Sequence, residues 1–283
     1  DVIRNLSGMW QILFKDKYVR YFDVPQNYVD SIGGTFYIEE LGVLRDDLGK
    51  LRGAPITDAE LNASIGVFND NRAAIRDLYT YRAAKPWQAP TFEVYLVLRA
   101  GMVLPVEEHT QLVRDYMAAA DAVPRPKRDN ARVVLTGAFC EQPPLALIKS
   151  IEMSGCYIVD DDFMLVTRWL LDDVPADGNP LEELSKAFLH RSATTAAKYE
   201  TTREEKGVFL LNQVKTRAAE GVIFAAPSFC DPALLERPML QDVLGKHKVP
   251  HTAFKYAENT GQMAPIREQA GTFADSIKLW SAA

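Results

Sequence analysis

The sequence predicts an α/β protein whose second half is a four-stranded parallel sheet of flavodoxin-like order, doubly wound with helices. Four strand-length apolar runs follow one another at residues 131–139, 156–162, 221–227 and 251–257. Segments with helical periodicity separate these runs. The runs are almost continuously apolar, which is typical of parallel strands that are buried on both faces. Up to about Val123, by contrast, the periodicity is mostly helical.

The first half is expected to consist mainly of helices. The chain opens at Asp1 on a segment that reads as the middle of a helix. Thr57 and Asp58 form an N-cap signal, and a second helix is expected over Val106–Ala122. The apolar residues that recur at helical spacing after the N-cap are Leu61, Ile65, Phe68, Ile75, Leu78 and Tyr79. One short strand is expected at 18–25, where YVRYFDVP ends in proline.

The second half alternates its strands with further helices. These helices are expected over 144–153, directly after 162, over 181–189, 202–219, 232–246 and 262–279. A run rich in proline and charge at 124–130 separates the two halves. The predicted domains are therefore a helical remainder of an N-terminal lobe at 1–123, a hinge at 124–130, and an α/β lobe at 131–283.

Composition excludes several classes of protein. The 283 residues carry a net charge of −6, which argues against a general nucleic-acid binder. The one compact basic run, RPKR at 125–128, reads as a solvated linker, with a phosphate site as the alternative. No apolar run reaches the ~18 residues that cross a bilayer. Three cysteines do not suggest a secreted disulfide framework, so a reducing compartment, the cytoplasm, is expected.

The predicted sheet assigns the cysteines to two different rims. Cys140 and Cys230 each follow a strand and belong to the carboxyl rim, whereas Cys156 opens a strand and belongs to the opposite rim. Strands of about six residues at ~3.3 Å each put the rims roughly 20 Å apart. Cys156 is therefore interpreted as core packing. In the order 2-1-3-4, the loops that carry Cys140 and Cys230 flank the switch point, where ligands bind in such sheets.

Standard catalytic signatures do not resolve the chemistry. The chain has no phosphate loop of the GxxxxGK[ST] type, so no ATP site is expected in it. The run of aspartates at 160–162 reads as a helix N-cap, with a metal or substrate role as the alternative. Pairing of His247 and His251 on a metal is not expected, because Pro250 lies between them. A cysteine nucleophile at Cys140 or Cys230, and an iron–sulfur cluster, both stay open.

Three ordered stretches carry a family resemblance. They are LTGAFCEQPPLALIKSIEMSGCYIVDDD, EGVIFAAPSFCDPALLERPMLQDVLGKHKVPHTAFKYAEN and the ending TGQMAPIREQAGTFADSIKLW. Together they resemble the 2-hydroxyacyl-CoA dehydratase family, which includes the cluster-bearing subunits of ATP-dependent benzoyl-CoA reductase. The opening DVIRNLSGMWQILFKDKYVRYFDVP is similar to a family stretch that follows a cluster cysteine.

The resemblance implies two doubly wound lobes with a 4Fe-4S cluster held by three cysteines between them. The first lobe is incomplete and helix-rich here. Cys230, in the loop SFCDP, corresponds to the family's third cluster ligand and is the expected metal and cofactor ligand. The other two ligands are expected upstream of Asp1, so the chain is expected to be N-terminally truncated. Glu141 and Cys140 are candidate catalytic residues that assist protonation, with a helix-start carboxylate as the alternative for Glu141.

By resemblance, the reaction is low-potential one-electron reduction of a CoA thioester, and the loop GAFCEQPP favours dearomatising reduction of benzoyl-CoA. Radical dehydration of a 2-hydroxyacyl-CoA, and a cluster-free binding or scaffold subunit, are the alternatives. The implied partners are a homologous second cluster-bearing subunit, an ATP-hydrolysing electron activator and the acyl-CoA substrate. Neither nucleic acid nor a membrane is expected as a partner.

Overall fold

The computed structural model describes residues 2–137, 143–193, 207–257 and 263–281, and these fold into two compact units. The smaller unit comprises Asp1–Ile65 and Val174–Arg191, and the larger comprises Gly66–Asp173 and Ser192–Ala283. No helix of the described residues combines the length and apolar character that crossing a membrane requires.

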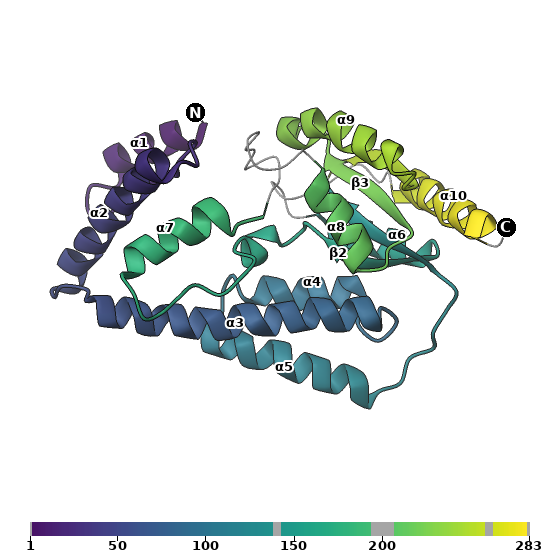
Figure 1. Ribbon diagram of the computed structural model, residues 1–283, viewed down its shortest axis with the longest axis horizontal. Coiled ribbons are helices and arrows are strands. Elements are labelled where there is room, and N and C mark those ends of the chain that lie inside the picture. The colour runs from purple at the N-terminus through teal and green to yellow at the C-terminus, as the bar shows by residue number, and fades with distance from the viewer. Residues whose placement is uncertain (1, 138–142, 194–206, 258–262, 282–283) are drawn as a thin grey trace. The chain divides into compact units, whose positions relative to one another are not determined.

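The smaller unit is built from helices (Figure 1). Its elements are α1 (Val2–Leu13), the π-helix η1 (Asp30–Gly34), α2 (Thr35–Arg52) and α7 (Pro180–His190). Asn179 is the N-cap of α7, and its side chain accepts hydrogen bonds from the backbone N–H groups of Leu181 and Glu182. Phe188 on α7 packs against Tyr37 on α2, with 4.9 Å between the ring centroids. Segments far apart in the sequence therefore build one unit.

The prediction of a strand at 18–25 is wrong, because this segment forms neither a helix nor a strand. Side chains attach it to α2 instead. The Tyr18 hydroxyl donates to Asp47 at 3.1 Å, and Arg20 pairs with Glu40 at 2.9 Å and with Asp47 at 3.5 Å. An extended chain becomes a strand only when a neighbouring strand accepts its backbone hydrogen bonds. The local sequence alone could not show that such a neighbour is absent within the described residues.

Helix α3 (Asp58–Ala84) begins in the smaller unit and ends in the larger one. The N-cap expected from the sequence is confirmed as a capping box. The backbone N–H of Glu60 donates to Thr57 Oγ1 at 3.3 Å, and the Glu60 carboxylate accepts from the backbone N–H of Thr57 at 2.8 Å. In the larger unit, α3 is joined by α4 (Thr91–Ala100) and α5 (Val106–Ala122), and the α5 bounds match the prediction.

The larger unit contains the predicted sheet (Figure 1). Strands β1 (Ala131–Thr136), β2 (Cys156–Asp161), β3 (Gly221–Pro227) and β4 (His251–Tyr256) pair in the order β2-β1-β3-β4. All three pairings are parallel, which confirms the flavodoxin-like order. Strand β1 ends at Thr136, before the predicted end at 139, and residues 138 and 139 lie outside the described ranges.

One irregularity interrupts the sheet. Val133 pairs with Ile158, but the next residue, Val134, pairs with Asp160, so Val159 is an extra residue in β2. Such a bulge reverses the alternation of side chains along the bulged strand. Asp160 therefore shares the face of Val134, and Asp161 shares the opposite face, that of Leu135.

Helices cover both faces of the sheet, as predicted. One face packs on α6 (Leu145–Met153), α10 (Met263–Ser281) and residues of α3 and α4, and the other packs on α8 (Val208–Thr216) and α9 (Asp231–Lys246). The prediction of an α-helix directly after 162 is wrong, because only the four-residue 3-10 helix η2 (Leu165–Arg168) forms there. Of the helix expected over 202–219, the described part is α8.

Candidate functional site

The carboxyl rim of the sheet places Cys230 at the start of α9. Strand β3 ends at Pro227, and Cys230 occupies the N-cap position of the helix. The residue is 8% exposed and packs with Ala226 and Ala233. The adjacent Phe229 is 93% exposed. The N-terminal end of a helix carries partial positive charge, which favours an anionic ligand at this position.

Backbone contacts fix the loop that carries Cys230. The N–H of Ser228 donates to the carbonyl of Tyr256 at 2.8 Å, and the Ser228 hydroxyl donates to the same oxygen at 2.9 Å. The Cys230 N–H donates to the carbonyl of Pro227 at 3.1 Å. These bonds tie the tip of β3 to the end of β4. The thiol therefore has a defined position at the rim, as a ligand or nucleophile requires.

The end of β1 is tied to the end of β2 at the same rim. The Asp162 carboxylate accepts from the Thr136 hydroxyl at 2.9 Å and from the Gly137 N–H at 2.6 Å. Gly137 has φ of +108°, a conformation that favours glycine. Cys140 and Glu141 follow directly and lie outside the described residues. Their predicted roles, and the ligand role of Cys230, stay predictions.

Asp160 and Asp161 do not form the helix N-cap that the sequence predicted. Asp160 and Asp161 are buried, and both are paired with arginines. Arg82 on α3 pairs with Asp161 at 2.6 Å. Asp160 pairs with Arg168 at 3.0 Å and with Arg217 at 2.9 Å. Because α-helix does not follow β2, these carboxylates have no helix to cap.

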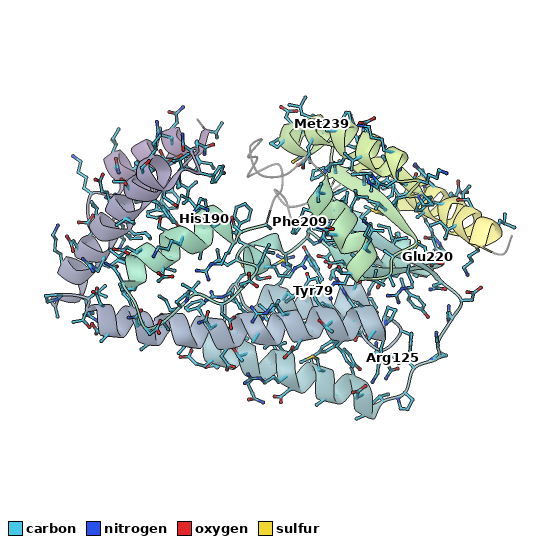
Figure 2. All side chains as sticks on the ribbon, viewed as in Figure 1. Tyr79, Arg125, His190, Phe209, Glu220 and Met239 are labelled. Carbon is cyan, nitrogen blue, oxygen red and sulfur yellow. The ribbon has the colours of Figure 1, made fainter. Side chains whose placement is uncertain are left out.

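Tyr79, labelled in Figure 2, contacts two of these arginines. Its ring centroid lies 4.4 Å from the guanidinium carbon of Arg82 and 3.6 Å from that of Arg168. Burial opposes the charge of Asp160, but Arg168, Arg82 and Arg217 outweigh burial and hold its pKa below the usual range. Burial raises the pKa of Tyr79, which keeps its hydroxyl neutral as a donor to Asp161 at 3.2 Å. Sequence reasoning missed these arginines, because Arg82 and Arg217 are distant in the sequence and Arg168 forms no recognisable motif with the aspartates.

Cys156 lies at the amino rim, as predicted, and is fully buried. Its thiol lies 4.0 Å from the carbonyl oxygen of Ala270 on α10. Burial raises the pKa of Cys156 to about 12, so the thiol is protonated at neutral pH. These observations agree with the interpretation of Cys156 as core packing.

The described residues hold no cluster of three or more His, Cys, Asp or Glu side chains that fits a metal ion. His247 and His251 each direct a ring nitrogen at a backbone carbonyl, that of Val243 at 2.9 Å and that of Val249 at 3.0 Å. Both rings therefore interact with the local backbone.

Glu152 on α6 is a further titratable group that the sequence did not single out. Its carboxylate accepts from the N–H groups of Thr91 at 2.5 Å and Phe92 at 3.4 Å, so it caps α4. Burial raises its pKa to about 7, although the two N–H donors oppose this shift. The folded protein therefore binds this proton more tightly than the unfolded chain does.

We expect the proton on Glu152 to link stability to pH. The stabilisation that protonated Glu152 gives the folded state is fully present below its unfolded pKa of about 4.5. It is lost as the pH rises through its folded pKa of about 7. The loss is at most about 3 kcal/mol, since one pKa unit is about 1.4 kcal/mol. Urea unfolding between pH 4.5 and 7.5 measures it. Glu152→Gln should flatten the pH profile, whereas Glu107→Gln on the exposed start of α5 should leave it unchanged. Identical profiles for wild type and Glu152→Gln would contradict the linkage.

Comparison with known proteins finds relatives that match nearly the whole chain. The family model described as 2-hydroxyglutaryl-CoA dehydratase, D-component, matches residues 1–277. A benzoyl-CoA reductase subunit of Thauera aromatica is 64% identical over 281 residues, which cover 99% of this chain and 73% of that protein. The beta subunit of lactoyl-CoA dehydratase of Anaerotignum propionicum is 26% identical, with 98% of this chain and 72% of that protein covered. The beta subunit of (R)-2-hydroxyglutaryl-CoA dehydratase of Acidaminococcus fermentans is also 26% identical, with 98% and 73% covered.

Proposed function

Because this chain belongs to the 2-hydroxyglutaryl-CoA dehydratase D-component family, we propose that it is a subunit of an oxidoreductase that reduces benzoyl-CoA. The observation that carries the proposal is the identity to the Thauera aromatica reductase subunit, which is far higher than the identity to the dehydratase subunits. Radical dehydration of a 2-hydroxyacyl-CoA is the second candidate, and the dehydratase relatives favour it.

The proposal includes a 4Fe-4S cluster with Cys230 as one ligand. The fit rests on a single thiol that is almost buried, held by a hydrogen-bonded loop and located at the positive end of α9. Cys156 does not fit, since its protonated thiol lies at the other rim. When bound, such a cluster supplies electrons one at a time at low potential.

The chain's own residues would position this chemistry. The bonds from Ser228 to Tyr256 hold the Cys230 loop, and the bonds from Thr136 and Gly137 to Asp162 hold the end of β1 at the switch point. The crevice between such loops is where ligands bind in doubly wound sheets. There the CoA thioester would lie, sheltered from water, with Glu141 or Cys140 as the proposed proton donor.

The wider organisation is part of the same proposal. We take the helix-rich residues 1–123 as part of a first doubly wound lobe, 124–130 as a hinge and 131–283 as the second lobe. The relatives are named as subunits, which supports an assembly of several different chains. The proposed partners are a homologous second subunit and an ATP-hydrolysing activator. The low cysteine content supports the cytoplasm as its compartment.

We expect the assembled enzyme, purified without oxygen, to reduce benzoyl-CoA when reductant and ATP are supplied. Products from benzoyl-CoA and from 2-hydroxyglutaryl-CoA are to be compared by mass spectrometry. A mass gain of two hydrogens on benzoyl-CoA supports the reductase, and a loss of water from 2-hydroxyglutaryl-CoA supports the dehydratase instead. Full activity of the complex without this subunit would overturn both.

A further inference from the structure

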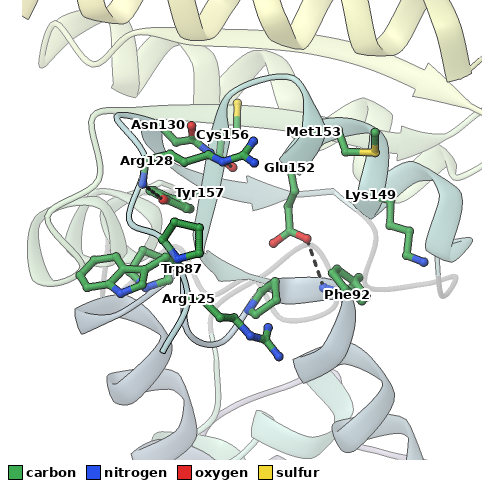
Figure 3. Close-up of a pocket in the computed structure, with 13 residues that line it drawn as sticks. Trp87, Phe92, Arg125, Arg128, Asn130, Lys149, Glu152, Met153, Cys156 and Tyr157 are labelled. Atoms are coloured by element: carbon green, nitrogen blue, oxygen red, sulfur yellow. Dashed lines mark hydrogen bonds between the residues drawn. The ribbon is translucent and has the colours of Figure 1, made fainter. Parts of the chain in front are cut away.

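A cavity of about 520 Å³ opens at the amino rim of the larger unit, where β2 begins (Figure 3). Its volume lies in the range of pockets that bind small molecules. The side chains that define its character are Trp87, Phe92, Tyr157, Arg128, Lys149 and Glu152. They come from the α3–α4 loop, from α4, from the segment before β1, and from α6 and β2. Cys230 lies at the opposite rim of the sheet.

Aromatic rings form a large part of its wall. Trp87 and Tyr157 have ring centroids 6.4 Å apart with an interplanar angle of 57°. The Tyr157 hydroxyl is fixed, because it accepts from the Arg128 N–H at 2.7 Å. Phe92 lies across the cavity on the first turn of α4. Trp87 and Tyr157 are in direct contact, so a planar ligand would stack on this pair, across the cavity from Phe92.

The charge around the cavity is positive. Lys149 lies 4.8 Å from the ring centroid of Phe92, and Lys127 lies 4.9 Å from that of Trp87. Within the described part of the chain, the guanidinium of Arg128 makes no hydrogen bond or ion pair. Arg125 also lines the cavity but is paired with Glu93 at 2.9 Å. Two cations, Arg128 and Lys149, are therefore available to a ligand.

The acids beside the cavity are already engaged. Glu152 accepts the N–H groups that begin α4, and Glu93 accepts the Tyr116 hydroxyl at 3.0 Å as well as pairing with Arg125. Asp129 pairs with Lys278 at 3.3 Å. No acid among these neutralises Arg128 or Lys149, so the cavity favours a negatively charged guest.

We propose that this cavity binds a planar aromatic molecule that carries negative charge, its ring between the Trp87–Tyr157 pair on one side and Phe92 on the other, with Arg128 and Lys149 as the cations that attract its anionic group. The shared chemistry fits a nucleotide and an aryl carboxylate. The basic run 125–128 is then part of an anion site. This corresponds to the phosphate site that the sequence analysis gave as the alternative to a solvated linker.

Binding to the purified protein tests the proposal, with AMP and benzoate as the two aromatic anions. Adenosine and benzamide are their neutral counterparts, and inorganic phosphate is an anion without a ring. We expect AMP or benzoate to bind saturably in calorimetry, and at least tenfold more tightly than its neutral counterpart and than phosphate. Binding of AMP alone identifies a nucleotide site, and binding of benzoate alone an aryl carboxylate site.

The double variant Arg128→Gln with Lys149→Gln should weaken that binding at least tenfold. Lys186→Gln on α7 is the matched control and should leave it unchanged. All three positions are at least partly exposed, and melting curves check that each variant is folded. The proposal is overturned if neither AMP nor benzoate binds, if the neutral counterparts bind as tightly, or if the double variant binds like wild type. The measurement requires neither cluster nor turnover, so its outcome is separate from that of the proposed reductase activity.

Discussion

Replacing Cys230 by serine is expected to lower the iron content and the activity of the anaerobically purified enzyme by at least about tenfold, since even outer-shell changes at metal sites cost ~10–100-fold. Iron–sulfur clusters are held by thiolates, and a serine hydroxyl is a far weaker ligand for iron. The site itself should stay intact, because the loop is held by backbone bonds and by Ser228 rather than by the thiol. Iron per protomer, the visible absorption of the cluster and the rate with benzoyl-CoA are the measurements.

Cys156→Ala is the matched control. This thiol is buried at the amino rim, and its loss removes packing but no ligand. The variant should keep its iron and lose stability instead. Unchanged iron in Cys230→Ser would refute the ligand assignment. A covalent thioester on Cys230, detected by mass spectrometry, would support a cysteine nucleophile in its place.

Arg82→Met is expected to destabilise the larger unit by about 3–5 kcal/mol, the cost of breaking a buried ion pair. Arg82 is fully buried, and its loss leaves Asp161 with a buried charge and without its 2.6 Å partner. Asp161 also holds Tyr79 and the N–H of Phe163, so the change spreads from α3 to the end of β2. Chemical denaturation measures the free energy of unfolding.

Arg76→Met on the same helix provides the comparison. Arg76 pairs with Asp173 at 2.6 Å, but the two side chains are 41% and 55% exposed. An exposed pair contributes at most about 1 kcal/mol. Adding Asp161→Asn to Arg82→Met should recover part of the lost stability, because the unpaired charge is then removed. If Arg82→Met and Arg76→Met lower the free energy of unfolding equally, burial of the ion pair does not affect stability and the prediction is contradicted.

The sheet was predictable from the sequence because each strand carries its own local signal. GVIFAAP at 221–227 is fully buried, and its apolar run predicts the exact bounds of β3. The flavodoxin-like order was also predictable, since it is a common arrangement for four parallel strands with crossover helices. Local capping chemistry likewise predicted the start of α3 at Thr57 and Asp58.

Features that depend on distant partners were not predictable. The segment 18–25 reads as a short strand, but its neighbour is a helix. The aspartates at the end of β2 read as a cap, yet besides Arg168 their partners are Arg82, 78 residues or more before them, and Arg217, 56 residues or more after them. Likewise, nothing local relates Trp87 to Tyr157, although both line one cavity. Such pairs are defined only when the chain has folded.

The bulge at Val159 has a consequence for how this chain tolerates changes in length. With the extra residue, Asp160 faces the side of Arg217 and Asp161 faces the side of Arg82. Deleting one residue from β2 before Asp160 would exchange the two faces and send each carboxylate away from its arginine. Apolar substitutions at Val159 keep the spacing and preserve this arrangement. Along this strand, insertions and deletions are therefore constrained more strictly than the identity of the side chain.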